Sequence, residues 1–245
     1  MSQRSVDSPS TLPDWVFPWP AFDMAYGSCA LMVIDYQNYS VNPACGLTRL
    51  VIERHPHIAR YYVPRIREVT IPNTRRLLQA FREAGREVIF TRNGGLLPDG
   101  RDLIPRRRRR DAEAWDSTGA PTLWSAGTFE HEIIEELTPL PGEPVIDKNS
   151  SSPFNGTGID QLLRNLGIDC LFLSGMATDM CVENTARDAS DRGFNVVVLE
   201  DAVATFVPEH HYAALSALAR VYVQVWSTAG ALTWLAAASG EANRT

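Results

Sequence analysis

Six short apolar segments, separated mostly by stretches with helical spacing, constrain the fold of this chain more than any other feature. Continuous apolar strands that alternate with helices are typical of a parallel sheet covered on both faces. The sequence therefore predicts an α/β fold, a three-layer α/β/α arrangement around a six-stranded, mostly parallel sheet with Rossmann-like topology. The apolar segments lie at 30–34, 88–91, 144–147, 170–173, 195–199 and 221–225, and the helical ones at 65–83, 128–137, 158–166, 181–192, 208–219 and 228–238.

The chain of 245 residues divides into an arm and one domain. Residues 1–28 mix aromatic residues with proline, and we expect an irregular arm that wraps over the surface or over a neighbouring subunit. Residues 29–240 are expected to form a single domain, since one core can be built from a chain of this length. Residues 36–64 and 93–127 are expected to be the least regular and to build the rim of a pocket.

Charge and hydropathy argue against several classes of partner. The formal net charge is −6 at pH 7, no apolar run approaches membrane-spanning length, and the N-terminus carries no segment of signal-peptide type. We therefore expect a cytoplasmic protein that binds neither nucleic acid nor membrane. The arginine run Arg106–Arg110 is interpreted as a solvated or salt-bridged loop, and contact with an anionic ligand or another subunit is the less favoured interpretation.

Cys181 has the clearest chemical setting of the four cysteines. An apolar strand ends at Ser174-Gly175 and a helical pattern begins near Asp179, so the thiol is expected in the first turn of a helix. The positive end of a helix favours thiolate over thiol, and the sequence predicts a nucleophile at this position. The other three, Cys29, Cys45 and Cys170, have no such setting, and the spacing of the four suggests neither zinc nor disulfides.

Two more reactive side chains follow predicted strands. Asp35 comes directly after an apolar strand, and Lys148 ends another. Ligands of doubly wound sheets bind outside the carboxyl ends of the strands, where the two side chains are expected to meet Cys181. A carboxylate can accept the thiol proton, and an ammonium group stabilises the negative charges. Each residue alone is more often structural, but the combination favours a catalytic site without a histidine base.

Several ordered motifs resemble those of the isochorismatase-like cysteine hydrolases. The superfamily includes nicotinamidases, carbamoylsarcosine amidase, ureidoacrylate amidohydrolase and biuret hydrolase. The motifs are Ala-Leu-Met-Val-Ile-Asp-Tyr-Gln-Asn at 30–38, Trp-Ser-Ala-Gly-Thr at 124–128, Val-Ile-Asp-Lys-Asn-Ser-Ser-Ser-Pro-Phe at 145–154, Gly-Met-Ala-Thr-Asp-Met-Cys-Val-Glu-Asn-Thr-Ala-Arg-Asp-Ala at 175–189 and Val-Leu-Glu-Asp-Ala at 198–202.

The resemblance implies a catalytic triad of Asp35, Lys148 and Cys181. It also implies a non-proline cis peptide between Met176 and Ala177, and an oxyanion hole formed by the backbone N–H groups of Ala177 and Cys181. The implied reaction is cleavage of an amide or ureide C–N bond through a thioester on the cysteine.

Departures from the patterns of related families narrow the function. Nicotinamidases carry an Asp-x-His metal site, and the corresponding stretch here, residues 46–57, has none; Glu53, His55 and His57 are interpreted as a loop coincidence. We therefore predict neither a metal nor a cofactor. Isochorismatases that cleave a vinyl ether lack the cysteine, so Cys181 favours C–N cleavage. The segment 152–155 and the long arm look closest to the ureidoacrylate and biuret branch.

Residues near the strand ends are candidates for binding a small amide or ureide. The candidates are Gln37, Asn38, Tyr39, Asn93, Trp124, Phe154 and Thr178, with Arg92 considered beside Asn93. Core packing or turn formation is the alternative for several of them.

Three hypotheses for the function remain open at this point. The leading one is a cofactor-free amidohydrolase, expected to be a homo-oligomer, a dimer or tetramer, because the arm and the apolar stretch 229–238 suggest subunit contacts. The second is a vinyl-ether hydrolase, which retained activity in Cys181→Ala would support. The third is a catalytically inactive binding subunit, which slow labelling of Cys181 by iodoacetamide would favour.

Overall fold

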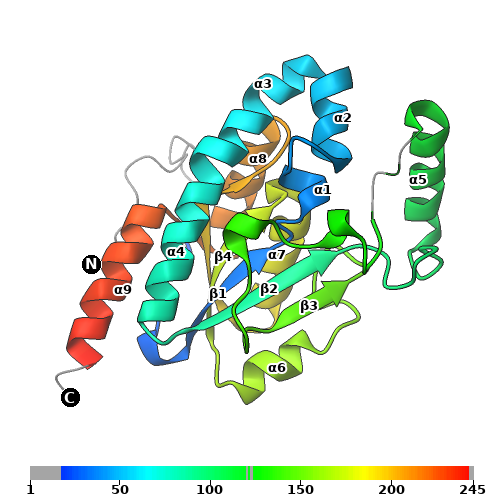
Figure 1. The fold of residues 1–245 in the computed structure, drawn as a ribbon. Coiled ribbons are helices and arrows are strands. Elements are labelled where there is room, and N and C mark those ends of the chain that lie inside the picture. Colours follow the sequence, from blue (N-terminus) through cyan, green and yellow to red (C-terminus); the bar gives the residue numbers. More distant parts are fainter. Residues whose placement is uncertain (1–17, 120, 122–123, 243–245) are drawn as a thin grey trace.

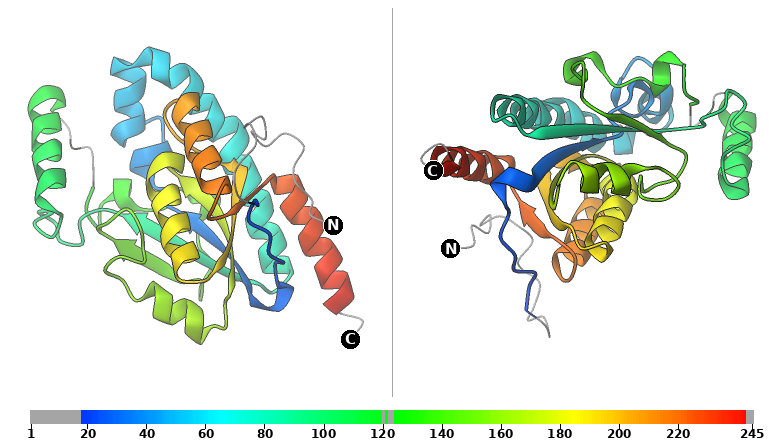
Figure 2. Two further views of the ribbon diagram at one scale, coloured as in Figure 1. Left: turned by 180° about the vertical axis from the view of Figure 1, so that it is seen from behind. Right: turned by 90° about the horizontal axis from the view of Figure 1, so that it is seen from below.

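The fold is a six-stranded sheet between two layers of helices (Figures 1 and 2). The computed structural model describes residues 18–119, 121 and 124–242. The strand order is β3-β2-β1-β4-β5-β6 and every neighbouring pair is parallel, which confirms the predicted fold class. The strands are β1 (Cys29–Ile34), β2 (Glu87–Asn93), β3 (Val145–Lys148), β4 (Cys170–Met176), β5 (Asn195–Ala204) and β6 (Gln224–Trp226).

The helices flank this sheet, and two π-helical turns join or precede them. The turn Arg65–Thr70 connects α3 to α4, and the turn Thr178–Val182 leads from β4 into α7. The α-helices are α1 (Asn38–Val41), α2 (Gly46–Arg54), α3 (Pro56–Pro64), α4 (Ile71–Glu83), α5 (Pro105–Thr118), α6 (Ile159–Asn165), α7 (Glu183–Asp191), α8 (Pro208–Ala219) and α9 (Thr228–Ala242).

The sheet is buried on both faces because β1 sends alternate side chains into two cores. Leu31 and Val33 pack in the core that contains residues of α4 and α9. Ala30, Met32 and Ile34 pack in the opposite core, with residues of α6, α7 and α8. Two apolar faces on each central strand explain why the strands appear in the sequence as continuous apolar runs.

One of the two segments predicted to be irregular is largely helical, and the other contains one helix. Residues 36–64 form α1, α2 and α3, so the prediction was wrong there, whereas residues 93–127 contain α5 between irregular stretches, so the prediction was wrong only for Pro105–Thr118. None of the residues of α5 is buried, so this helix lacks the apolar stripe on which the sequence prediction relied. Proline at the first position of α3 and of α5 was the available signal, because proline is tolerated there.

Two element boundaries also differ from the prediction. The segment 128–137 forms two short 3₁₀ turns, Phe129–His131 and Glu135–Leu137, although the Thr128 hydroxyl does cap the first by accepting from the backbone N–H of His131. The last strand starts at Gln224 because Val221 lies in an exposed turn after α8.

The arm is only partly described. Residues 1–17 lie outside the described residues, so the prediction that they wrap over the surface is not tested. Between residues 18 and 25 the chain has no regular structure, and Phe22 and Met24 pack against the core that contains α9. Among the helices in the described part of the chain, none is long and apolar enough to cross a membrane.

Candidate active site

Asp35 and Lys148 meet at the carboxyl edge of the sheet. Lys148 Nζ donates to Asp35 Oδ2 at 2.7 Å, and the two side chains are 0% and 3% exposed. Because β2 lies between β1 and β3, the lysine side chain reaches past one strand to make this bond. The sequence-based expectation that these strand ends converge is thus supported by their geometry.

Lys148 and Asp35 also form hydrogen bonds with other groups around them. Lys148 Nζ donates to the backbone oxygens of Ser150 and Ser151, at 3.2 and 3.0 Å. Asp35 Oδ1 accepts from the Thr91 hydroxyl at 2.7 Å. Asp35 has a φ of 55°, in the left-handed region that non-glycine residues seldom adopt. A fully bonded ion pair at a strained backbone position is typical of a functional site.

Cys181 completes the group from the π-helical turn that follows β4. Burial raises the pKa of its thiol to about 12, the nearby Lys148 ammonium lowers it, and the charge and hydrogen bond of Asp35 raise it. The expectation that a helix start would keep this cysteine as a thiolate is therefore wrong for the resting site. The resting group consists of a neutral thiol beside a carboxylate–ammonium ion pair.

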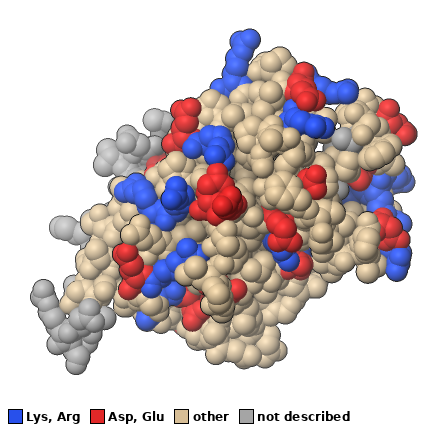
Figure 3. Space-filling view, viewed as in Figure 1, with Lys and Arg blue, Asp and Glu red and all other residues tan. Residues whose placement is uncertain are grey.

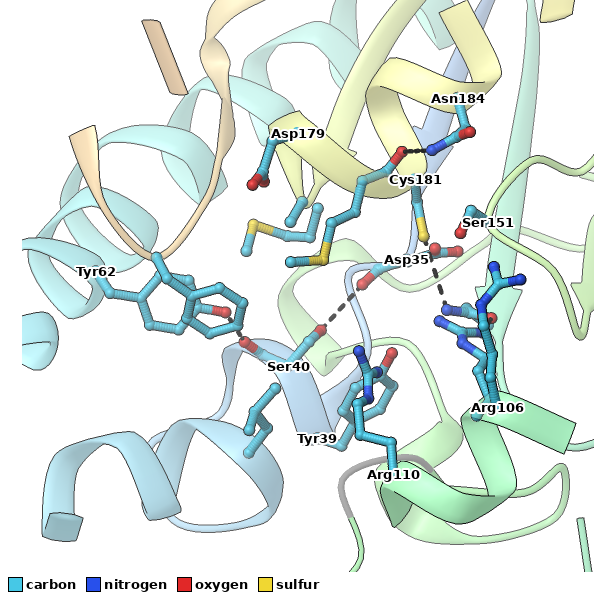
Figure 4. Close-up of a pocket in the computed structure, with 17 residues that line it drawn as sticks. Asp35, Tyr39, Ser40, Tyr62, Arg106, Arg110, Ser151, Asp179, Cys181 and Asn184 are labelled. Carbon is cyan, nitrogen blue, oxygen red and sulfur yellow. Dashed lines mark hydrogen bonds between the residues drawn. The ribbon is translucent and has the colours of Figure 1, made fainter. Parts of the chain in front are cut away.

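Two of the three side chains border a cavity of about 410 Å³ (Figure 4). Asp35 and Cys181 line it, while Lys148 lies behind Asp35. The Asn93 side chain points toward the sulfur, with Nδ2 3.7 Å from Sγ. A volume of this size fits a small molecule, with the thiol, the carboxylate and an amide at one wall.

Two of the predicted binding residues, Tyr39 and Asn93, line this cavity. Trp124 does not line it but stacks on the Tyr39 ring, with the centroids 5.2 Å apart, and so supports the wall from behind. Tyr39 lies in α1, shortly after the end of β1 and Asp35, which is why its position could be predicted from the sequence.

The other candidates are buried in structural contacts away from the cavity. Gln37 Nε2 donates to the backbone oxygen of His131, and Asn38 Nδ2 donates to that of Phe129. Phe154 packs on Phe194 in the core. Their side chains fix the surrounding loops rather than border the cavity. Arg92, considered with Asn93, forms an ion pair with Asp147.

Thr178 is also buried, and its hydroxyl bonds His211 Nδ1 at 2.9 Å. Its neighbour Ala177 lines the cavity, and the cis peptide between Met176 and Ala177 is confirmed.

Several lining residues were not predicted because they come from elements distant in sequence. Tyr62 comes from α3, Phe206 follows β5, and three arginines of α5 reach the cavity. The arginine run was noted in the sequence, but it was interpreted as a loop, and its position at the cavity was therefore not predicted. The unpredicted lining residues are Ser40, Leu47, Tyr62, Arg106, Arg107, Arg110, Ser151, Met176, Asp179, Met180, Asn184 and Phe206.

No group of three or more metal-ligating side chains that could hold an ion occurs within residues 18–119, 121 and 124–242. Glu53 and His55 lie at the end of α2, and His57 lies in the first turn of α3. The rings of the two histidines are 6.1 Å apart on the surface. The absence of a metal stays a prediction.

The fold is shared with solved hydrolase structures. A cysteine hydrolase from Pseudomonas syringae pv. phaseolicola superposes with a TM-score of 0.74 at 23% identity, covering 91% of this chain and 100% of that one. N-carbamoylsarcosine amidase from Thermoplasma acidophilum superposes with a TM-score of 0.57 at 27% identity, covering 82% and 96%. The chain thus has an isochorismatase-like α/β/α fold.

The particular family follows from the sequence comparisons. The isochorismatase domain model matches residues 29–230, so the chain belongs to the isochorismatase family. The ureidoacrylate amidohydrolase RutB of Stutzerimonas stutzeri is 32% identical over 211 residues, 84% of this chain and 80% of that protein. RutB of Pantoea ananatis is 35% identical over 147 residues, and this match spans 58% of its length and 57% of this chain.

Proposed function

We propose that this protein is a cysteine-dependent amidohydrolase that cleaves the C–N bond of a small carboxamide, ureide or carbamoyl compound. The observation that carries the proposal is the buried group of Asp35, Lys148 and Cys181 at the wall of a small cavity. The names of the relatives, ureidoacrylate amidohydrolase and N-carbamoylsarcosine amidase, point to the same class of bond.

In the first half of the reaction Asp35 takes the thiol proton as Cys181 Sγ attacks the carbonyl carbon. The raised pKa of the thiol means that proton transfer and attack are coupled, because a free thiolate is disfavoured at rest. The oxyanion accepts hydrogen bonds from the backbone N–H groups of Ala177 and Cys181. Protonated Asp35 then donates to the leaving nitrogen, the C–N bond breaks, and a thioester remains.

In the second half, water hydrolyses the thioester. Asp35 accepts a proton from the water, whose oxygen attacks the thioester carbon, and the C–S bond breaks to release the acid and the sulfur. The proton on Asp35 returns to the sulfur, which restores the thiol. The net reaction consumes one water and yields an acid and ammonia or an amine.

Lys148 does not need to transfer a proton in this scheme. Its ammonium is held by Asp35 and two backbone oxygens, so it fixes the position of the carboxylate that acts as the base. Asn93 donates a hydrogen bond to the sulfur through its amide nitrogen.

We further propose that residues 29–240 act as one domain, that the protein works in the cytoplasm as a homo-oligomer, and that it needs no metal. The extent of the family match supports the single domain. The largely apolar α9 supports contacts between subunits. Sedimentation of the purified protein measures the number of subunits.

A screen for ammonia or amine release across small amides and ureides tests the function. Wild type is compared with Cys181→Ala, and both are assayed with and without a chelator. The proposal expects release by wild type, none by the variant, and no effect of the chelator. Release that persists in Cys181→Ala would contradict a cysteine-dependent mechanism, and release lost with the chelator would contradict the metal-free mechanism.

A further inference from the structure

Three arginines of α5 border the catalytic cavity, although this helix stands apart from the body of the molecule (Figures 1 and 2). Arg106, Arg107 and Arg110 line the cavity that contains Cys181, whereas their neighbours Arg108 and Arg109 line neither that cavity nor the adjoining one. Figure 4 shows Arg106 and Arg110 extending from the helix toward the space in front of Cys181. The run is therefore divided into side chains that face the site and side chains that face solvent.

The part of the chain that the structure describes offers no ion-pair partner for these three arginines. Among the described residues, no carboxylate lies within ion-pairing distance of any of them, whereas Arg82 and Arg92 are each paired with an acid. The chain as a whole carries a net charge of −6, so a general excess of base does not explain the cluster. Figure 3 shows basic side chains over α5 with acidic ones beside them.

The acidic residues that line the cavity do not offset this charge. Asp35 is already paired with Lys148. Asp179 accepts a hydrogen bond from the Thr205 hydroxyl and lies 3.5 Å from His210, on the side of the cavity formed by the turn after β4. The first turn of α5 holds no acidic residue, so the positive end of this helix adds to the arginine charge. The cavity is thus electropositive at its α5 wall.

The charge lies close to the reacting atoms. Arg107 Nη1 donates to Asn93 Oδ1 at 3.2 Å, and the nitrogen of the same amide lies 3.7 Å from Cys181 Sγ. One amide group therefore separates the guanidinium from the nucleophile. When the carbonyl carbon of a substrate lies at the sulfur, a group of the same substrate that Arg107 binds is only a few covalent bonds away from that carbon.

A second cavity of about 430 Å³ adjoins the first at the same place. The two share Arg106, Arg107, Ser151 and Asn184, and the second is lined largely by polar side chains. The two arginines thus stand where the cavities meet. An anionic group bound there can accept hydrogen bonds from planar guanidinium groups, the donors that best match a carboxylate.

We propose that the substrate is an acid, with a carboxylate a few bonds from the scissile carbonyl, and that Arg107 binds this carboxylate together with Arg106 and Arg110. The inference rests on the proposed function and adds to it the charge of the substrate and the element that recognises it. Neutral amides of the same size leave three arginines without an anion and are poor substrates.

Matched pairs of acids and methyl esters test this inference. The probes are 3-ureidopropionate, ureidoacetate and succinamate, each assayed beside its methyl ester for kcat/KM. Wild type is expected to prefer the acid by at least about tenfold, since a hydrogen bond to a charged group contributes about 1.5–3 kcal/mol. Arg107→Gln is expected to raise KM for the acid by about tenfold or more and to reduce the acid-to-ester ratio of kcat/KM accordingly. Arg106→Gln and Arg110→Gln are expected to reduce this ratio by smaller factors.

The matched controls come from the same run of arginines. Arg108→Gln and Arg109→Gln remove the same charge from the same helix without altering the cavity lining, so both are expected to keep the preference for the acid. Raised ionic strength is expected to lower kcat/KM for the acids and not for the esters. Equal rates for acid and ester, or an equal loss in all five variants, would overturn the inference while the proposed function stands.

Binding without turnover separates the two proposals. Calorimetric titration of Cys181→Ala with the three acids is expected to show binding that Arg107→Gln abolishes and Arg109→Gln keeps. Hydrolysis of none of the probes, combined with binding of the acids, would contradict the proposed function alone. No binding of any acid to Cys181→Ala would overturn the arginine site.

Discussion

Lys148 Nζ lies 2.7 Å from Asp35 Oδ2 in a pair that is almost wholly removed from water. Desolvation of two charges costs several kcal/mol each, and the pair is retained because the partners compensate one another. The ion pair places the Asp35 carboxylate, the base of the proposed reaction, close to the buried Cys181 thiol.

Breaking this pair is expected to destabilise the protein. Asp35→Asn or Lys148→Met leaves one buried charge without a partner and is expected to lower the free energy of unfolding by about 3–5 kcal/mol. The double variant Asp35→Asn/Lys148→Met buries no charge and is expected to cost less than the sum of the single variants. Urea denaturation measures all three, and additive costs would contradict a coupled pair.

Reactivity of Cys181 is expected to rise when Asp35 is neutralised. The charge and hydrogen bond of Asp35 raise the pKa of the thiol, and Lys148 lowers it. Asp35→Asn removes the influence of the carboxylate and leaves that of Lys148, so the pKa falls. Alkylation by iodoacetamide at pH 7 then speeds up, by about threefold for each unit of pKa, because the larger thiolate fraction is partly offset by lower nucleophilicity. Hydrolysis by the same variant is expected to be lost. Peptide mapping separates Cys181 from the more accessible Cys45.

Whether Asp35→Asn is labelled faster or slower than wild type is more informative than the labelling rate of wild type alone. A resting thiol with a pKa of about 12 labels slowly even in an active enzyme. Slow labelling therefore does not favour an inactive binding subunit, contrary to the expectation from sequence. Slower labelling in Asp35→Asn than in wild type would contradict the described electrostatics.

Folding stability is expected to fall as the pH drops below 6.5. Burial and the Arg65 charge lower the pKa of His211 to about 3, whereas an unfolded histidine titrates near 6.5. Between these values the unfolded state binds a proton that the native state does not, so each such group costs about 1.4 kcal/mol per pH unit.

His211→Asn measures this contribution. Urea denaturation at each pH measures the free energy of unfolding. Between pH 6 and pH 4 this free energy is expected to fall less steeply with pH in the variant than in wild type, and the difference in slope corresponds to about one bound proton. His131, whose pKa is also lowered by burial, keeps part of the dependence in both proteins. Parallel curves for wild type and variant would exclude His211 as the linked group.

Gly175 is expected to tolerate no side chain. Its φ is 153°, and a Cβ atom there would overlap the backbone oxygen of Ile34 in the neighbouring strand β1. Gly85 has a φ of 64° but open space around it, so Gly85→Ala is the matched control for conformation alone. Gly175→Ala is expected to cost about 1–3 kcal/mol more than Gly85→Ala in thermal or urea unfolding. Equal costs would show that the two strands can separate locally.

The sheet and the three reactive side chains could be predicted because each depends on a local pattern. Strands buried on both faces give apolar runs, and Asp35, Lys148 and Cys181 each follow such a run at the edge where ligands bind. The positive φ of Asp35 and the exact bonding of the ammonium have no comparable signature in the sequence.

The cavity lining was harder to predict because it depends on the directions of side chains and on distant elements. Gln37 is two residues from Asp35, yet its amide is tied to His131 and Asn93 and points away from the cavity. Arg107 is 74 positions before Cys181, on a helix without a buried face. The pKa of Cys181 follows from burial, which the local sequence around a strand end does not specify.

The central claim is that Cys181 is the nucleophile. The most direct test mixes the protein with an amide or ureide that wild type hydrolyses, quenches the reaction in acid during turnover, and measures the mass of the intact protein. A nucleophilic Cys181 predicts a transient mass increase equal to the acyl group, located on the peptide that contains Cys181 and absent from Cys181→Ala, whose kcat/KM falls by at least about 10³-fold. Turnover by Cys181→Ala at a rate near that of wild type, with no adduct on either protein, would contradict the account.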